Sequence, residues 1–148
     1  MLIIGVGNAY RGDDGAGLAV AHALRATLPP EIEVIEESGE GTSLMDAWRG
    51  ASRVILIDAV HSGAVPGTIH HFDASTSTVP TALFPCSTHA FGVADAIEMA
   101  RALRELPEQL MIYGIEGGNF DEIDGLSRDV QHAVAAVVRQ ILQGLHQP

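Results

Sequence analysis

The stretch MLIIGVGNAYRGDDGAG, residues 1–17, decides the fold class. Its opening run, residues 1–6, is apolar and ends in a glycine-rich turn, which is typical of a short strand buried on both faces. A helix is predicted next, at residues 14–28, where Leu18, Ala21 and Leu24 recur at helical spacing and Pro29 stops it. A buried strand followed by a glycine turn and a helix predicts a mostly parallel sheet.

The same alternation continues along the chain. Strands are predicted at residues 32–36, 53–58 and 110–115, with a weaker stretch at 68–72 that need not be parallel to the others. Helices are predicted at 42–48, 89–106 and 127–145, with Thr42 and Ser127 as N-caps. Right-handed crossovers place helices on both faces of such a sheet. We therefore expect one domain over residues 1–148, an α/β three-layer sandwich with a mostly parallel, twisted sheet of about five strands.

Composition excludes several classes of function. Nineteen acidic residues against eight basic ones give a net charge of −11, which disfavours nucleic acid and anionic membranes as partners. The basic residues are all arginines, so lysine-dependent chemistry is excluded, including that of a P-loop. The single cysteine, the absence of a basic leader and the absence of any apolar run of ~18 residues together predict a cytoplasmic protein.

The glycine-rich turn resembles a dinucleotide-binding loop, but its charges disfavour a nucleotide. Such loops lay a pyrophosphate on the helix N-terminus, and here Asp13 and Asp14 would repel it. One of these aspartates suffices to cap the helix, a contribution of ~1 kcal/mol. The other is expected to point into a crevice, where it could bind a cation or activate water. We therefore expect no bound nucleotide.

Two further residues complete a candidate site. Asp58 ends the strand RVILID, and ligands in open α/β sheets bind beyond the carboxyl ends of strands. If the first and third strands are neighbours, Asp58 and Asp14 share one rim of the sheet; a turn-capping role for Asp58 is equally open. His89 is predicted at a helix N-terminus, which favours a neutral imidazole. Two carboxylates and an imidazole suit a borderline divalent cation such as zinc, nickel or iron.

The other histidines and the cysteine are weaker candidates. His61 follows Asp58 closely and could orient it, whereas His89 itself could have a purely structural role. Cys86 lies close to His89 in the unusually long loop 73–88, but no third orienting group supports a nucleophile there. A loop of this length is more often functional or mobile than accidental.

These motifs resemble those of the hydrogenase maturation proteases, endopeptidases that trim the large subunit of [NiFe] hydrogenases. The resemblance covers nearly the whole chain. It rests on four segments, GVGNAYRGDDGAG, VILIDAVHSGAVPGTIHHFD, STHAFGVADAIEMARAL and GIEGGNFDEIDGLS.

The resemblance implies a substrate and a site. The family's metal-binding acid, aspartate and histidine correspond to Asp14, Asp58 and His89. They would recognise nickel carried by the large-subunit precursor, so that the C-terminal extension is cut only after nickel insertion. Whether they recognise the metal, catalyse hydrolysis or do both stays open. The stretch ESGEGT, residues 37–42, departs from the family's Asp-Gly-Gly-Thr-like run, which leaves the client hydrogenase undetermined.

Three other functions remain open from the sequence. A related α/β peptidase with a different substrate would keep the fold. A nucleotide-binding or regulatory module would gain thermal stability from ATP or NAD. A nickel-binding accessory protein without hydrolysis would still bind metal after loss of a catalytic residue.

Overall fold

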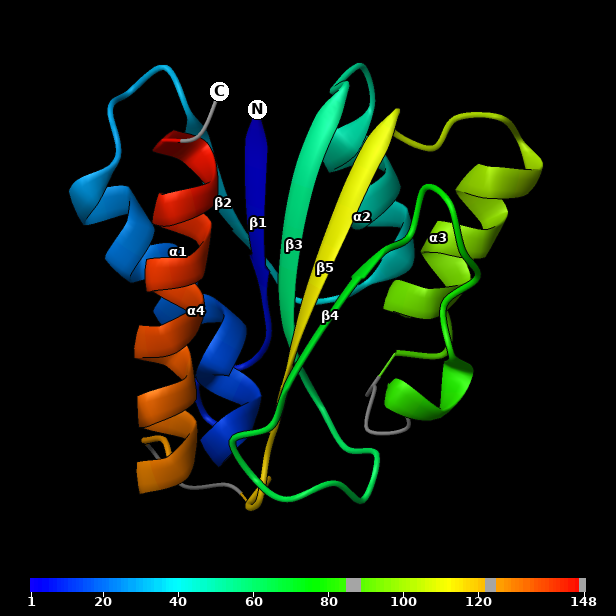
Figure 1. Cartoon of the computed structure of the whole chain (residues 1–148). Coiled ribbons are helices and arrows are strands. Elements are labelled where there is room, and N and C mark those ends of the chain that lie inside the picture. Colours follow the sequence, from blue (N-terminus) through cyan, green and yellow to red (C-terminus); the bar gives the residue numbers. More distant parts are fainter. Residues whose placement is uncertain (85–88, 122–124, 147–148) are drawn as a thin grey trace.

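The computed structural model describes residues 1–84, 89–121 and 125–146, and it contains a five-stranded sheet with the order β2-β1-β3-β5-β4 (Figure 1). The parallel strands are β1 (Leu2–Val6), β2 (Glu33–Glu37), β3 (Arg53–Val60) and β5 (Gln109–Glu116). The edge strand β4 (Ile69–Asp73) is antiparallel to β5. The predicted α/β class and the predicted exception at residues 68–72 are confirmed.

Helices cover both faces of the sheet (Figure 1). On one face lie α1 (Ala16–Thr27) and α4 (Arg128–His146), and on the other α2 (Gly41–Trp48) and α3 (Val93–Ala102). Because strand side chains alternate between faces, β1 and β3 supply both of the resulting cores. Leu56 packs with the residues of α2 and α3, while its neighbour Ile57 packs with those of α1 and α4.

Helices α3 and α2 begin at residues other than those predicted from the sequence. The helix predicted from residue 89 begins only at Val93, because Asp95 accepts a hydrogen bond from the Gly92 backbone nitrogen at 3.0 Å and fixes the start there. It ends at Ala102, shortly before Arg104 turns the chain with a φ of 60°. The prediction that His89 lies at a helix N-terminus is therefore wrong.

The second of these helices is α2. Its N-cap is Glu40 and not Thr42, because the Glu40 carboxylate accepts hydrogen bonds from the backbone nitrogens of Thr42 and Ser43 at 3.0 and 2.8 Å. Those bonds lower the pKa of Glu40 to about 2. Two short 3₁₀ turns, η1 (Gly12–Gly15) and η2 (Thr81–Leu83), complete the described elements. Within the described ranges, no helix is long and apolar enough to cross a bilayer.

Candidate functional site

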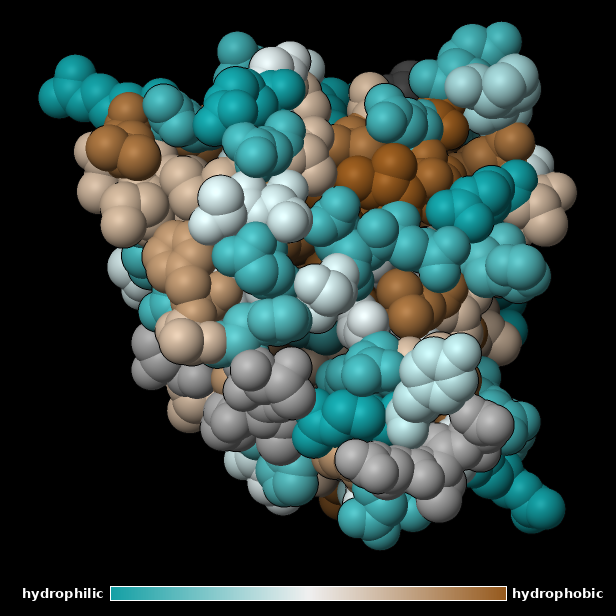
Figure 2. Space-filling view, turned by 180° about the vertical axis from the view of Figure 1, so that it is seen from behind, coloured by the Kyte–Doolittle hydropathy of each residue, from teal (hydrophilic) through white to brown (hydrophobic). Residues whose placement is uncertain are grey.

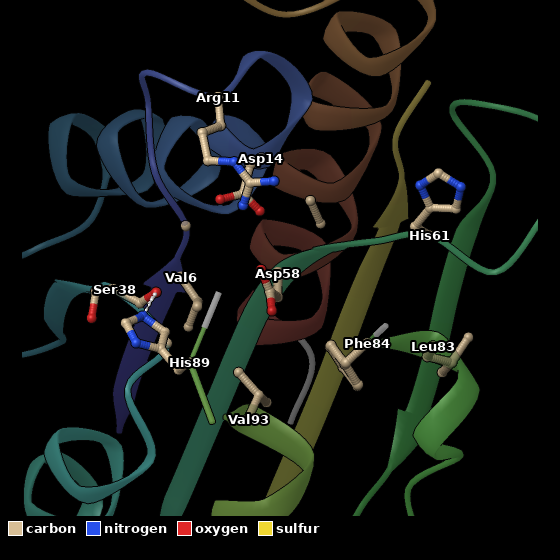
Figure 3. Close-up of a pocket in the computed structure, with 13 residues that line it drawn as sticks. Val6, Arg11, Asp14, Ser38, Asp58, His61, Leu83, Phe84, His89 and Val93 are labelled. Atoms are coloured by element: carbon tan, nitrogen blue, oxygen red, sulfur yellow. Dashed lines mark hydrogen bonds between the residues drawn. The ribbon is translucent and has the colours of Figure 1, made fainter. Parts of the chain in front are cut away.

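A pocket opens at the carboxyl ends of β1 and β3, between the glycine-rich loop and the residues that precede α3 (Figure 3). Its volume is about 30 Å³, which is room for a water molecule or a metal ion. Gly5 of β1 pairs with Ile57 of β3, so Asp58 lies level with Val6 at the end of β1. Asp14, Asp58 and His89 come from three separate segments and all line this pocket.

Asp14 enters the pocket from the turn η1, after the loop that leaves β1. The loop is held against it by the backbone nitrogen of Asn8, which donates to Asp14 Oδ2 at 3.0 Å. This close fold requires glycine at Gly7, where a Cβ atom would lie 2.0 Å from the Asp14 carbonyl oxygen. Burial raises the pKa of Asp14 above its usual value, although the nearby Arg11 guanidinium, the Asn8 hydrogen bond and His89 act in the opposite direction.

Asp58 is the most buried of the three, at 8% exposure. It shares its face of β3 with Leu56, so its side chain projects towards α3 and the pocket (Figure 3). Burial raises the pKa of Asp58 well above the usual range, and the negative charge of Asp14 adds to this, while the Ala59 backbone hydrogen bond opposes it. The two carboxyl groups therefore influence each other across the pocket, as the predicted shared rim requires.

His89 lies on the other side of the pocket, close to Val6 and Ser38 (Figure 3). Its Nε2 atom is 3.2 Å from the carbonyl oxygen of Ser38. A carbonyl oxygen can only accept, so the hydrogen of this bond lies on Nε2. In the neutral ring, Nδ1 then carries the lone pair.

Arg11 and His61 also line the pocket. Arg11 supplies a positive charge beside Asp14, and it was missed from the sequence although it is the basic residue of the glycine-rich loop. The His61 ring packs against Phe120 with ring centroids 5.3 Å apart. Seen from behind, the most strongly apolar residues gather in the upper half of the molecule, with hydrophilic residues around them (Figure 2).

The three predicted residues line one pocket without forming a closed ligand cluster. Among the residues that the structure describes, no group of three or more histidine, cysteine, aspartate or glutamate side chains is near enough to hold a metal ion. Cys86 lies outside the described residues. The sequence therefore predicted which residues face the same pocket, while their precise role stays a prediction.

The sequence left open which of Asp13 and Asp14 caps the helix, and Asp13 has a different role. It is 1% exposed, and its carboxylate accepts hydrogen bonds from the backbone nitrogens of Gly118, Asn119 and Ser127 at 2.8, 3.0 and 2.7 Å. The Ser127 hydroxyl donates to it as well, at 2.9 Å. The first residue of α1 follows Gly15, which provides no side-chain cap. Asp13 thus ties the glycine-rich loop to the segment after β5 and to the start of α4.

Glu116 is a second buried acid at this end of the sheet that the sequence analysis missed. It is 1% exposed and accepts hydrogen bonds from the Ser62 nitrogen and hydroxyl at 2.7 and 2.6 Å. His70 Nε2 lies 3.1 Å from Glu116 Oε1, the oxygen that also accepts from the Ser62 hydroxyl. Burial alone would raise the pKa of Glu116, but these contacts outweigh it and lower the pKa. The rule that selected Asp58, an acid at a strand's carboxyl end, would also have selected Glu116.

Comparison with known proteins identifies relatives over most of the chain. The family model described as hydrogenase maturation protease (HycI) matches residues 18–144, a range that includes Asp58 and His89 and begins just after Asp14. The hydrogenase 2 maturation protease of Escherichia coli K12 is 28% identical over 152 residues, which cover 99% of this chain and 91% of that protein.

Solved structures agree with this match. An endopeptidase from E. coli determined in solution superposes with a TM-score of 0.82 at 25% identity, over 98% of this chain and 92% of that one. The hydrogenase maturating endopeptidase HybD from E. coli has the same fold, with a TM-score of 0.77 at 24% identity over 97% of this chain and 90% of its own.

Proposed function

Because this chain belongs to the hydrogenase maturation protease family, we propose that it removes the C-terminal extension of a [NiFe] hydrogenase large-subunit precursor after nickel has been inserted. The substrate is the precursor, and nickel is part of that substrate. The observation that carries the proposal is the meeting of Asp14, Asp58 and His89 in one small pocket at the carboxyl edge of the sheet. No nucleotide takes part.

The donor set of the pocket suits nickel. Two carboxylates and an imidazole are ligands of a borderline divalent cation, and none of them is selective by itself. Metal-binding histidines commonly donate their second ring N–H to a backbone carbonyl, which fixes the ring orientation. His89 makes such a bond to the carbonyl oxygen of Ser38, and this supports a role for His89 as a ligand. Nickel presented by the precursor would complete the site.

The same residues can perform hydrolysis of the neighbouring peptide bond. Nickel carried by the precursor and held by these residues would supply polarisation of the scissile carbonyl or of the attacking water, and Asp14 or Asp58 would remove a proton from that water. The water oxygen bonds to the carbonyl carbon, the C–N bond breaks, and the leaving nitrogen takes up the proton. In this scheme cleavage depends on nickel because the metal both docks the precursor and activates the bond.

The test compares nickel-loaded and nickel-free precursor by intact mass after incubation with the protein. We expect loss of a C-terminal peptide from the loaded precursor alone. Asp14→Asn and His89→Ala should each slow processing by about 10²-fold or more, the size of a lost catalytic or ligand group. The matched controls are Asp46→Asn and His22→Ala, which alter exposed residues on helices away from the pocket. Normal trimming by both pocket variants would contradict the proposal.

A further inference from the structure

The outer edge of β4 has backbone groups available for pairing. The Glu116 nitrogen donates to the Thr68 carbonyl oxygen, and the Ala74 nitrogen donates to the Leu110 carbonyl oxygen, each at 2.8 Å. The backbone N–H and C=O groups of the even-numbered residues of β4 therefore point towards β5. Antiparallel strands alternate in this respect, so Ile69 and His71 direct their N–H and C=O groups away from β5. Within the described residues, no backbone group outside the sheet and no side chain donates to or accepts from these outward groups.

A groove of about 340 Å³ runs along this edge. Its β4 wall includes His70, His71 and Phe72, whose side chains alternate between the two faces of the sheet. Because the groove contacts consecutive residues whose side chains lie on opposite faces, it follows the edge of β4 and not one face of the sheet. The opposite wall is the segment before η2 and η2 itself, including Thr78 and Leu83.

The groove adjoins the pocket of Asp14 and Asp58. Leu83 lines both, and its carbonyl oxygen accepts a hydrogen bond from the His61 nitrogen at 3.2 Å. The sheet register also places them at the same level, since Gly114 pairs with Asp58 on one side and with His70 on the other. A strand added beside β4 would lie three strand spacings, about 14 Å, from β3. About four or five extended residues cover that distance at ~3.3 Å each.

We propose that the C-terminal segment of the precursor binds as an extended strand along the outer edge of β4 and leads its scissile bond into the pocket. This inference rests on the proposed function and names where its substrate lies. The outward groups of Ile69 and His71 supply main-chain hydrogen bonds, the mode of recognition known as strand addition. Main-chain hydrogen bonds do not depend on the side chains of the bound segment. The groove would therefore set the path of the C-terminal segment, while nickel would set the point of cleavage.

The decisive comparison is His71→Pro against His71→Ala. Both lose the imidazole, which stacks on Tyr113 at a centroid distance of 4.1 Å, but only proline also removes the outward N–H. Proline is tolerated at an edge strand where the N–H faces outward. We expect His71→Pro to raise the KM for nickel-loaded precursor about tenfold over His71→Ala with kcat nearly unchanged, as the loss of one main-chain hydrogen bond predicts.

A second variant tests the groove without altering β4. Thr78→Trp fills the groove from its exposed opposite wall, and Gln143→Trp adds the same side chain to the exposed face of α4 as the control. Thr78→Trp should raise KM about tenfold or more, and Gln143→Trp should leave it unchanged. If His71→Pro lowers the melting temperature too far to be assayed, Thr78→Trp decides the question.

The outcomes separate this inference from the proposed function. Cleavage by the wild type with equal KM values for His71→Pro, His71→Ala and Thr78→Trp would overturn strand addition and leave the protease assignment intact. If the wild type cleaves no precursor, binding of a synthetic peptide of the precursor's C-terminal segment, measured by fluorescence anisotropy, tests the groove with the same variants. A dimer in sedimentation equilibrium that Thr78→Trp dissociates would also overturn it, because a second copy would then occupy the edge.

Discussion

Replacing Asp13 by alanine should strongly destabilise the protein. The change removes a carboxylate that is 1% exposed and leaves the backbone nitrogens of Gly118, Asn119 and Ser127 without their acceptor. Each buried polar group left without a partner costs about 1–3 kcal/mol. Water that enters the vacated space can bond to some of these groups and so reduces the total penalty. We expect a loss of about 4 kcal/mol in the free energy of unfolding, or a fall of about 10 °C in melting temperature for a domain of this size.

Asp13→Asn should cost less, because one carbonyl oxygen remains. Oδ2 accepts from Gly118, Asn119 and the Ser127 hydroxyl, while Oδ1 accepts only from the Ser127 nitrogen. An asparagine that keeps its oxygen at the Oδ2 position loses one backbone bond and the negative charge, about 2 kcal/mol. The control Asp46→Ala removes an exposed ion pair with Arg49 and should cost well under about 1 kcal/mol.

The destabilisation should also depend on pH. Burial would raise the pKa of Asp13, but the hydrogen bonds from Ser127, Gly118 and Asn119 outweigh it and hold the pKa below its usual value. A carboxyl group with a lowered native pKa stabilises the fold above its unfolded pKa of about 3.9, and that stabilisation is lost as the pH falls through the native value. The difference in melting temperature between wild type and Asp13→Asn should therefore be largest at pH 7 and should decrease below about pH 4. Thermal unfolding followed by circular dichroism at both pH values measures it. Equal melting temperatures of wild type and Asp13→Ala at pH 7, or a gap to Asp13→Asn that does not change with pH, would refute the reasoning.

Two further changes probe the packing and the pocket. Gly17→Ala in α1 should prevent stable folding, because its Cβ would lie 2.3 Å from the Ile57 carbonyl oxygen and 2.4 Å from that of Val6, whereas Gly144→Ala in α4 meets nothing within 4 Å. Gly144→Ala should raise stability by about 0.5–1 kcal/mol, and chemical denaturation of both variants measures the contrast. Asp58→Asn should abolish processing. It should also raise the melting temperature at pH 8 in the presence of EDTA. Burial raises the pKa of Asp58, so this carboxyl group increasingly lowers the free energy of unfolding as the pH rises above its unfolded pKa. A lower melting temperature at pH 8 would show that the Asp58 carboxylate is stabilising and contradict this account.

The strands and their neighbours were largely predictable from the sequence. Buried parallel strands produce continuous apolar runs, and RVILID at residues 53–58 has only this interpretation. Because β1 and β3 pair directly, the carboxyl-end rule placed Asp58 and Asp14 at one edge. Strand order itself is not contained in any local sequence pattern.

The starts of α2 and α3 were not predictable with the same rules, because side chains chosen by three-dimensional contacts set them. Thr42 is a good N-cap by type, yet the longer Glu40 side chain reaches two backbone nitrogens and displaces it from that role. At α3, Asp95 folds back to Gly92 and leaves His89 outside the helix. His89 consequently reaches the pocket from a bend that precedes α3, and its hydrogen bond to Ser38 helps to orient it where a helix N-terminus does not.

The pair Asp13 and Asp14 shows why the site could be located but not divided into roles from the sequence. The two residues are chemically identical and adjacent, and either could cap a helix or enter a crevice. Their difference arises from residues more than a hundred positions away, since Gly118, Asn119 and Ser127 supply donors for Asp13 alone. Once Asp13 is fixed by these bonds, the turn η1 directs Asp14 into the pocket beside Asp58. The Asp13 carboxylate thereby helps to hold Asp14 in place, so under the proposed function loss of Asp13 should impair processing of the precursor even where the protein remains folded.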